Sequence, residues 1–237
     1  MSGKDITALL SNNEYAGRGI ILGLDKAGKN AVIAYFLMGR SVNSRNRVFV
    51  ENGDGLLIRA FDESKMEDPS LIIYSPILVS ANNTIVTNGD QTDTVYEALQ
   101  NGGCFEDALH KRTYEPDAPN YTSRISGMVT VAEAACTYKL SILKRLDTDN
   151  PACLRQFFDY EAVAGTGHFI HTYLGNGEPL PRFCGEPVRL ELPFADIDEF
   201  TAALWRSLNA DNKVSLVTRY ISLADGEYSQ RIINRNC

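Results

Sequence analysis

The chain has 237 residues, and its hydrophobic content of 44% is ordinary for a folded domain. Its formal net charge of −7 argues against a general nucleic-acid or membrane-surface binder, because such proteins present a basic face. Any anion binding must therefore be local.

The first half of the chain reads as a series of β-strands. Residues 15–25 and 30–39 are apolar, β-rich runs, and the turn sequence KAGK between them indicates a hairpin. Further strands are predicted at 47–53, 55–62, 70–80 and 83–89. After two helical segments, strands are predicted again at 124–133, 135–146, 213–223 and 228–234. Residues 167–175 look extended, whereas residues 150–166 give no clear pattern.

Three segments show helical signals instead. Residues 92–102 begin at Thr92 or Asp93 and stop at Asn101-Gly102, and residues 105–112 form a second short helix. The clearest helix is predicted at 195–210, opened by Ala195 or Asp196. It carries one apolar stripe, formed by Ile197, Phe200, Leu204 and Leu208.

Strands come in runs and helices in blocks, without βαβ alternation. The sequence therefore predicts an α+β protein with mostly antiparallel sheets, two of them packed face to face with helices outside. Because no internal repeat, low-complexity tract or linker interrupts the chain, we expect a single domain over residues 1–237.

The chain carries no sign of export. Its first residues lack the apolar core of a signal peptide, and no apolar run approaches the roughly 18 residues of a membrane span. Its five cysteines are scattered and form no C-x-x-C pair, which indicates reduced thiols. We therefore expect a cytoplasmic protein without a membrane or nucleic-acid partner.

Several common kinds of site find little support. His168 and His171 form H-x-x-H in an extended segment, where residues three apart point to opposite faces, so a metal site is not predicted. There is no G-x-S-x-G motif for a nucleophilic triad and no phosphate loop of P-loop spacing. We expect neither a metal nor another cofactor.

The segment MGRSVNSRNRVF, residues 38–49, holds three arginines and no acid. One reading is a solvated edge, since arginine is usually exposed. The other is an oxyanion site, because guanidinium groups bind phosphate bidentately and Ser and Asn add neutral donors. If the segment is extended, Arg45 and Arg47 share one face, whereas Arg40 and Ser44 share the other.

Two later stretches hold further polar candidates. The loop TYEPDAPNYTSR brings Glu115, Asp117 and Arg124 together with two tyrosines, a set able to shuttle protons. Capping acids in an ordinary loop explain it equally well. Asn88, in TNGDQTDT, is typical of a turn at a strand end, where its amide is also able to meet a ligand.

Taken in order, five motifs resemble the archaeal-type IMP cyclohydrolase family. They are YAGRGIILG, GRSVNSRNR, DPSLIIY, VTNGDQTDT and YEPDAPNYTSRI, and together they cover about residues 15–130. The resemblance implies a four-layer αββα sandwich like that of the N-terminal-nucleophile hydrolases. It also implies closure of 5-formamidoimidazole-4-carboxamide ribotide to IMP with loss of water, without metal or cofactor.

The resemblance also implies roles for particular residues. Arg45 would polarise a substrate oxygen or hold the carboxamide, Tyr74 would stabilise the formyl oxygen, and Glu115 would take the carboxamide proton. Asn88 would orient the base. The candidates for binding the 5′-phosphate are Arg18, Arg47 and Arg124.

Two other functions remain open from the sequence. A non-catalytic sensor of purine ribotides would keep the same phosphate cradle. An amide hydrolase of the N-terminal-nucleophile type would need a Ser, Thr or Cys at the start of the first strand, and none stands there near Tyr15. The family also suggests a homo-oligomer, and unpaired β edges would gain from such pairing.

Overall fold

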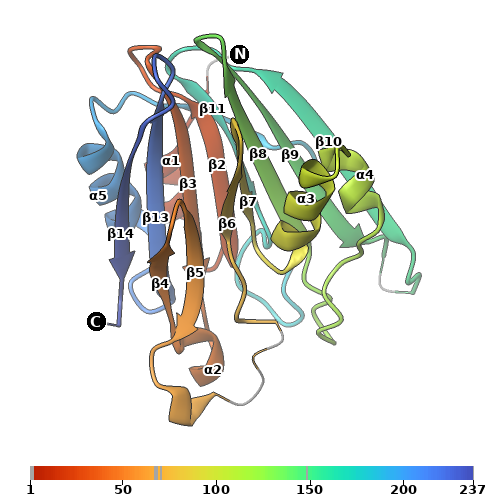
Figure 1. Ribbon diagram of the computed structural model, residues 1–237. Helices are drawn as coiled ribbons and strands as arrows, with labels where there is room; N and C mark the ends of the chain where they lie inside the picture. The colour runs from red at the N-terminus through yellow and green to blue at the C-terminus, as the bar shows by residue number, and fades with distance from the viewer. Residues whose placement is uncertain (1–2, 67–68, 70, 148, 237) are drawn as a thin grey trace.

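The computed structural model describes residues 3–66, 69, 71–147 and 149–236. Fourteen strands in this part of the chain form two seven-stranded sheets (Figure 1). Sheet I has the order β1 (Lys4–Asp5), β12 (Val188–Glu191), β11 (Thr166–His171), β2 (Arg18–Leu24), β3 (Asn30–Met38), β13 (Lys213–Ser222) and β14 (Tyr228–Asn234). Sheet II has the order β10 (Cys153–Glu161), β9 (Ala135–Arg145), β8 (Arg124–Ala132), β7 (Asn83–Thr87), β6 (Ile77–Ser80), β5 (Gly55–Ala60) and β4 (Arg47–Asn52).

The strands pair antiparallel, apart from the short parallel pair of β1 and β12. The predicted hairpin of β2 and β3 is confirmed, with Arg18 opposite Leu37 and Leu24 opposite Ala31. Strand β3 is buried on both faces, as expected for the centre of a sandwich.

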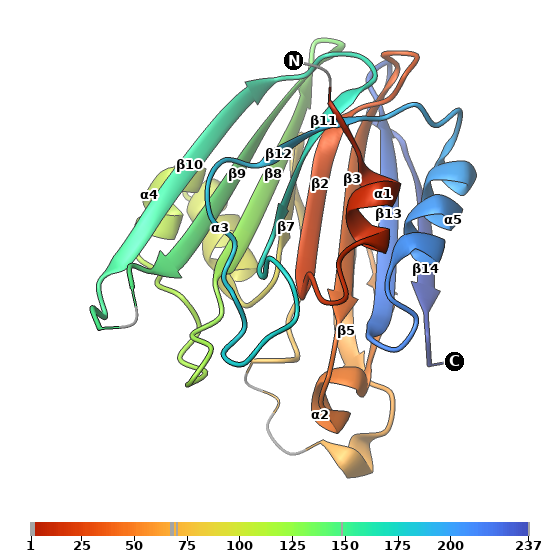
Figure 2. The same cartoon turned by 180° about the vertical axis from the view of Figure 1, so that it is seen from behind.

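Alternate residues of the central strands face two different cores. Ile33, Tyr35 and Leu37 of β3 pack between the sheets, whereas Val32, Ala34 and Phe36 pack against the helices outside sheet I. These helices are α1 (Ile6–Ser11) and α5 (Ile197–Ser207). On the far side of sheet II lie α3 (Gln91–Gln100) and α4 (Phe105–His110), which cover a third apolar cluster. Figure 2 shows both helical layers on the outer faces.

The α+β class and the two packed sheets are therefore confirmed, whereas likeness to the N-terminal-nucleophile hydrolases stays a prediction. Helix α5 follows its predicted apolar stripe, and the Asp196 carboxylate caps it by accepting a hydrogen bond from the Glu199 N–H at 2.8 Å. Helix α3 starts earlier than expected, at Gln91. Of the helices in the described part of the chain, none has the length and apolarity to cross a membrane.

The prediction of one long strand over 70–80 is wrong for its first part. Strand β6 starts only at Ile77, because the carbonyl of Pro69 accepts hydrogen bonds from the Ile72 and Ile73 N–H groups and turns the chain. Residue 70 lies outside the described residues. The unassigned region after residue 150 contains β10, an edge strand whose residues pair only with β9 in the described part of the chain.

Phe200 tests the packing of α5 on sheet I. Its side chain is fully buried, with ring centroids 5.0 Å from Phe194 and 6.1 Å from Tyr220. We expect Phe200→Ala to lower the free energy of unfolding by about 3–5 kcal/mol, measured by urea denaturation. Arg206→Ala, on the exposed face of the same helix, should change it by less than about 0.5 kcal/mol. Equal effects of the two substitutions would contradict this packing.

Candidate active site

A polar cavity of about 260 Å³ opens at the end of the sandwich where β2 begins and β3 ends. We call it the site cavity. The short helix α2 (Val42–Arg45) lies beside it, at the bottom of Figures 1 and 2. Its lining residues are Tyr15, Arg18, Met38, Arg40, Ser41, Ser44, Arg47, Ile72, Asp117, Asn120, Thr122, Tyr173 and Leu180.

Arg18 reaches this cavity because Gly17 bends the chain just before β2. Gly17 has φ +75, and a Cβ there would lie 2.2 Å from the Thr172 hydroxyl oxygen. Its carbonyl accepts a hydrogen bond from the Met38 N–H at 2.8 Å, which ties the start of β2 to the end of β3. The bend before β2 therefore requires glycine at position 17, the glycine of the YAGR sequence.

The arginine segment is not extended, so the expected sharing of faces by Arg45 and Arg47 is wrong. Ser41 and Ser44 cap α2 reciprocally, each side chain bonding the other residue's backbone N–H. This helical turn directs Arg45 away from the cavity. Its Nε donates to the Gly39 carbonyl at 2.9 Å and its Nη2 to the Asn212 side-chain oxygen at 3.3 Å.

Arg47 faces the cavity instead. It opens β4, its residue is 1% exposed, and its Nε donates to the Ser44 carbonyl at 2.9 Å. Of the other described candidates, Arg40 stands at the cavity wall, where it bonds the Asn176 side chain at 2.9 Å and lies over the Tyr15 ring.

Arg47 is buried and the Arg18 side chain is 12% exposed, and both are incompletely paired. Arg18 Nε and Arg47 Nη1 are inaccessible and have no hydrogen-bond partner among the described residues. Burial and the nearby Arg18 charge lower the pKa of Arg47. Burial disfavours the charged form of Arg18, but the Glu115 carboxylate and the nearby phenols of Tyr74, Tyr173 and Tyr35 together outweigh burial and hold the pKa of Arg18 well above its ordinary value. Two neighbouring guanidinium groups with unpaired N–H atoms are chemically suited to bind an anionic oxygen.

Glu115 lies behind Arg18, with 2% of the residue exposed. Its Oε2 is 3.5 Å from Arg18 Nη2, whereas its Oε1 is buried without a hydrogen-bond partner in the described part of the chain. Burial raises the pKa of Glu115, against the opposing effect of the Arg18 and Arg124 charges. This carboxylate therefore holds a proton more readily than an ordinary glutamate and has an oxygen free to accept one.

Tyr74 forms a buried pair with Tyr35 of β3, a residue that the sequence did not single out. Their hydroxyl oxygens lie 2.7 Å apart, and burial raises the pKa of both phenols. Both hydroxyls are therefore protonated near neutral pH, and one donates to the other. When Tyr35 is the donor, Tyr74 is able to donate its own proton onward. The alternation of inward and outward side chains along β3 would have placed Tyr35 between the sheets. No local sequence signal, however, would have identified Tyr74 as its hydrogen-bond partner.

The loop that carries Glu115 is held by Asp117. The Asp117 carboxylate accepts a hydrogen bond from the Thr122 N–H at 2.6 Å and another from the Thr122 hydroxyl, which also contacts the Tyr173 hydroxyl. The Glu115 N–H donates to the Thr122 carbonyl at 2.9 Å. Asp117 thus closes the loop, which fixes Glu115 relative to Arg18.

Asn88 and Arg124 lie deeper and do not line the cavity. The side-chain oxygen of Asn88 accepts from the Ile125 N–H and from Gln91 Nε2, and its amide donates to the Ser123 carbonyl. Arg124 Nη1 bonds Asp90 and the Gln91 side chain, both at 2.7 Å. These contacts join the end of β7 to the start of β8 and so support the wall that carries Glu115.

His168 and His171 lie on opposite faces of sheet I, as their spacing predicts. The His168 Nδ1 is 2.7 Å from the Tyr138 hydroxyl, in the space between the sheets. The His171 ring stacks on Phe169, which belongs to the core outside sheet I. Neither histidine lines the site cavity.

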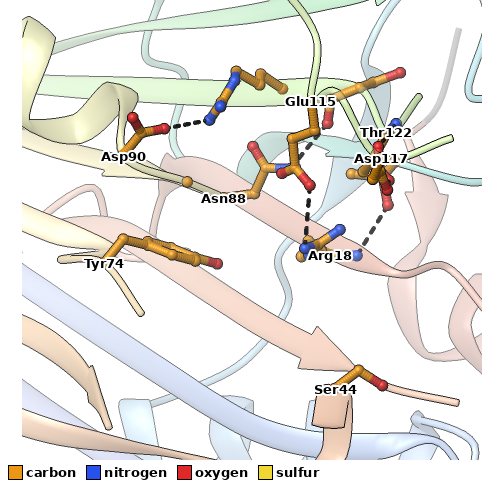
Figure 3. Close-up of polar contacts among 12 residues, drawn as sticks. Arg18, Ser44, Tyr74, Asn88, Asp90, Glu115, Asp117 and Thr122 are labelled. Atoms are coloured by element: carbon orange, nitrogen blue, oxygen red, sulfur yellow. Dashed lines mark hydrogen bonds and ion pairs between the residues drawn. The ribbon is translucent and has the colours of Figure 1, made fainter. Parts of the chain in front are cut away.

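Figure 3 shows how the site converges. Arg18 and Glu115 point toward each other, and the Tyr74 ring extends toward them from another element, whereas Ser44 lies apart from this group. Arg18, Arg40 and Arg47 line the cavity, whereas the Glu115 carboxylate of raised pKa and the neutral Tyr74 phenol lie buried outside its lining. Such a set is able to bind an anionic or carbonyl oxygen and to accept a proton beside it.

Comparison with known families adds one finding. A family model described as "IMP cyclohydrolase-like protein" matches residues 15–226. The match continues through the last third of the chain, where the sequence motifs alone were vague. A search of curated proteins finds no match.

Removing Arg47 should make the ligand-free protein more stable. Replacing a buried, partly unpaired cation by an apolar side chain relieves its desolvation and its repulsion from Arg18. We therefore expect Arg47→Met to raise the free energy of unfolding by about 1–3 kcal/mol, measured by urea denaturation. Inorganic phosphate should stabilise the parent protein, and it should stabilise this variant less, because Arg47 lines the same cavity as Arg40, Ser41 and Ser44.

The exposed Arg59 offers a matched control, since Arg59→Met removes the same charge outside the cavity. It should leave stability within about 0.5 kcal/mol and keep the response to phosphate. A marked loss of stability in Arg47→Met would mean that Arg47 serves the fold rather than a ligand.

Proposed function

The chain belongs to the IMP cyclohydrolase-like family, and on that premise we propose that it closes 5-formamidoimidazole-4-carboxamide ribotide to IMP with loss of water. The observation that carries the proposal is the buried group of unpaired atoms at Arg18, Arg47 and Glu115. An acceptor oxygen between the guanidiniums and a proton donor at the carboxylate would satisfy all three. The ribotide brings both, since its formyl oxygen is an acceptor and its carboxamide N–H is a donor.

The reaction sets clear demands on the site. The carboxamide nitrogen forms a bond to the formyl carbon and gives up a proton, while the formyl oxygen gains negative charge and is then protonated. The resulting hydroxyl group leaves as water when the ring C=N bond forms. The chain must therefore hold two arms of one molecule together, stabilise an oxyanion and move protons.

We assign the proton acceptor to Glu115 and the oxyanion to Arg47 and Tyr74. The raised pKa of Glu115 suits a group that takes a proton and returns it when the hydroxyl leaves. Arg47 supplies a free N–H, and Tyr74 supplies a phenol kept neutral by burial and backed by Tyr35. Arg47 thereby takes the role that the sequence resemblance assigns to Arg45.

We assign the 5′-phosphate to the wall of the cavity nearer solvent. Arg40, Ser41 and Ser44 line it there, and all three come from one short segment around the start of α2. Arg18 remains beside Glu115, where its charge holds the carboxylate in place. Asn88 and Arg124 act on the substrate only through the wall that they support.

Loss of the Glu115 carboxylate should abolish ring closure. We expect Glu115→Gln to lower kcat by about a hundredfold or more, because a general base contributes that much. In the parent protein, activity should fall as pH falls through the pKa of Glu115. Since burial raises this pKa, the fall should begin above the ordinary glutamate pKa of about 4.3. Formation of IMP from the formamido ribotide, followed by absorbance, measures both effects.

Arg47 and Arg45 form a matched pair of variants. Arg47→Met should lower kcat/KM by about a hundredfold or more, as expected when an oxyanion donor is lost. Arg45→Met, which removes the same charge two residues earlier, should retain most of the activity because Arg45 faces Gly39 and Asn212. The reverse ranking would return the role to Arg45.

Binding and turnover separate this proposal from a sensor. IMP and the formamido ribotide should both bind to the parent protein, and only the ribotide should be consumed. Tight binding of IMP without any conversion of the ribotide would support a non-catalytic sensor instead.

A further inference from the structure

The opposite end of the sandwich holds a second and larger cavity, of about 680 Å³. We call it the far cavity. Its walls come from the β13–β14 turn of sheet I and from the β4–β5, β6–β7 and β8–β9 turns of sheet II. The β13–β14 and β8–β9 turns lie at the top of Figure 1, whereas α2 and the site cavity lie at its lower end. The proposed reaction uses none of the residues of the far cavity.

A buried arginine stands in this cavity. Arg219 lies on the face of β13 that carries Val217 and Ile221 into the core between the sheets, and its residue is 1% exposed. Its Nε and Nη2 donate to the Gln230 side-chain oxygen at 3.0 and 2.7 Å. Its Nη1 is buried without a hydrogen-bond partner among the described residues.

Arg219 also has no ion-pair partner within the described part of the chain. Its guanidinium lies 4.1 Å from the centre of the Tyr228 ring. Burial lowers its pKa, and the charges of Tyr228 and Asp54 oppose that effect. Arg219 is thus a buried cation with a free N–H between the apolar residues Val217 and Ile221 of β13, and no acceptor for that N–H is found among the described residues.

The rim of the far cavity is acidic. Four of its lining residues carry carboxylates, and none of them forms an ion pair with a lysine or arginine of the described residues: Asp54, Glu133, Asp225 and Glu227. Three of the four non-glycine residues with positive φ also line it, namely Ala81, Glu133 and Ala134. Glu-Ala at the two-residue β8–β9 turn is a strained choice where Asn-Gly is usual.

From these contacts we propose that the far cavity binds a small zwitterion of the amino-acid class, with its carboxylate on Arg219 and its ammonium group among the rim carboxylates. A simple anion would meet Arg219 but also four carboxylates, and a simple cation would leave Arg219 unpaired. A ligand with both charges satisfies both ends. The volume of the cavity is within the usual range for small-molecule sites.

Isothermal titration calorimetry on the full chain tests this with five probes. Glycine, 4-aminobutyrate and 6-aminohexanoate carry both charges at increasing separation, whereas hexanoate and hexylammonium carry one each. We expect one zwitterion to bind with 1:1 stoichiometry at millimolar concentration or below. It should bind at least about tenfold more tightly than either singly charged probe, because each loses a charge-assisted contact.

Variants locate the binding. Asp225→Asn/Glu227→Gln should weaken the zwitterion about tenfold and should strengthen the weak binding of hexanoate, because two carboxylates that repel an anion are lost. Glu161→Gln/Glu191→Gln removes two exposed carboxylates away from the cavity and should change nothing. Arg219→Gln should remove binding of both the zwitterion and hexanoate. If that variant does not fold, the test rests on the Asp225→Asn/Glu227→Gln variant alone.

Two results would overturn the proposal. One is failure of all three zwitterions to bind at 10 mM, an upper limit for a built small-molecule site. The other is zwitterion binding with the same affinity in the Asp225→Asn/Glu227→Gln variant, the control variant and the parent protein. Because the test follows binding at the far end, its outcome does not depend on whether the chain forms IMP.

Discussion

The structure depends on the burial of two guanidinium groups, those of Arg18 and Arg47, at one end of a β-sandwich. Taking a charge out of water costs several kcal/mol unless it is paired, and two like charges add repulsion. Glu115 offsets part of this at Arg18, whereas among the described residues the Arg47 guanidinium bonds only the Ser44 carbonyl. Costly buried charges of this kind cluster at functional sites, and this is the physical basis on which we propose that a ligand binds here.

The rest of the local architecture brings these groups together from different sheets. Arg18 opens β2 of sheet I and Arg47 opens β4 of sheet II, so the site forms only when the two sheets pack. Gly17 sets the entry to β2, the Ser41–Ser44 pair sets the entry to β4, and Asp117 closes the loop of Glu115. Each of these features joins residues that are close in sequence. Together they hold Arg18, Arg47 and Glu115, which are far apart in sequence, at a fixed geometry.

Each end of the sandwich holds a buried arginine, but the side chains around the two arginines differ in charge. At each end a buried arginine has an N–H without a hydrogen-bond partner among the described residues, namely Arg47 at one end and Arg219 at the other. The site cavity adds further arginines and hydroxyls, which suits an anion. The far cavity adds carboxylates, which suits a ligand that carries both charges. Between them, the aliphatic and aromatic core keeps the two cavities apart.

The sequence by itself determined the α+β class, most strands, the helix at 195–210 and the family. These follow from the period of apolar residues and from short motifs, both of which are local properties of the chain. It also placed Glu115, Tyr74 and an arginine-rich segment among the candidates. The tertiary structure alone decided which arginine faces the cavity, because one capped helical turn sends Arg45 outward and Arg47 inward. It alone paired Tyr74 with Tyr35, joined Asn88 to Arg124 through Gln91, and left Arg219 without a carboxylate. Such contacts join residues far apart in sequence, and their geometry is set by the packing of two sheets rather than by any neighbouring residue.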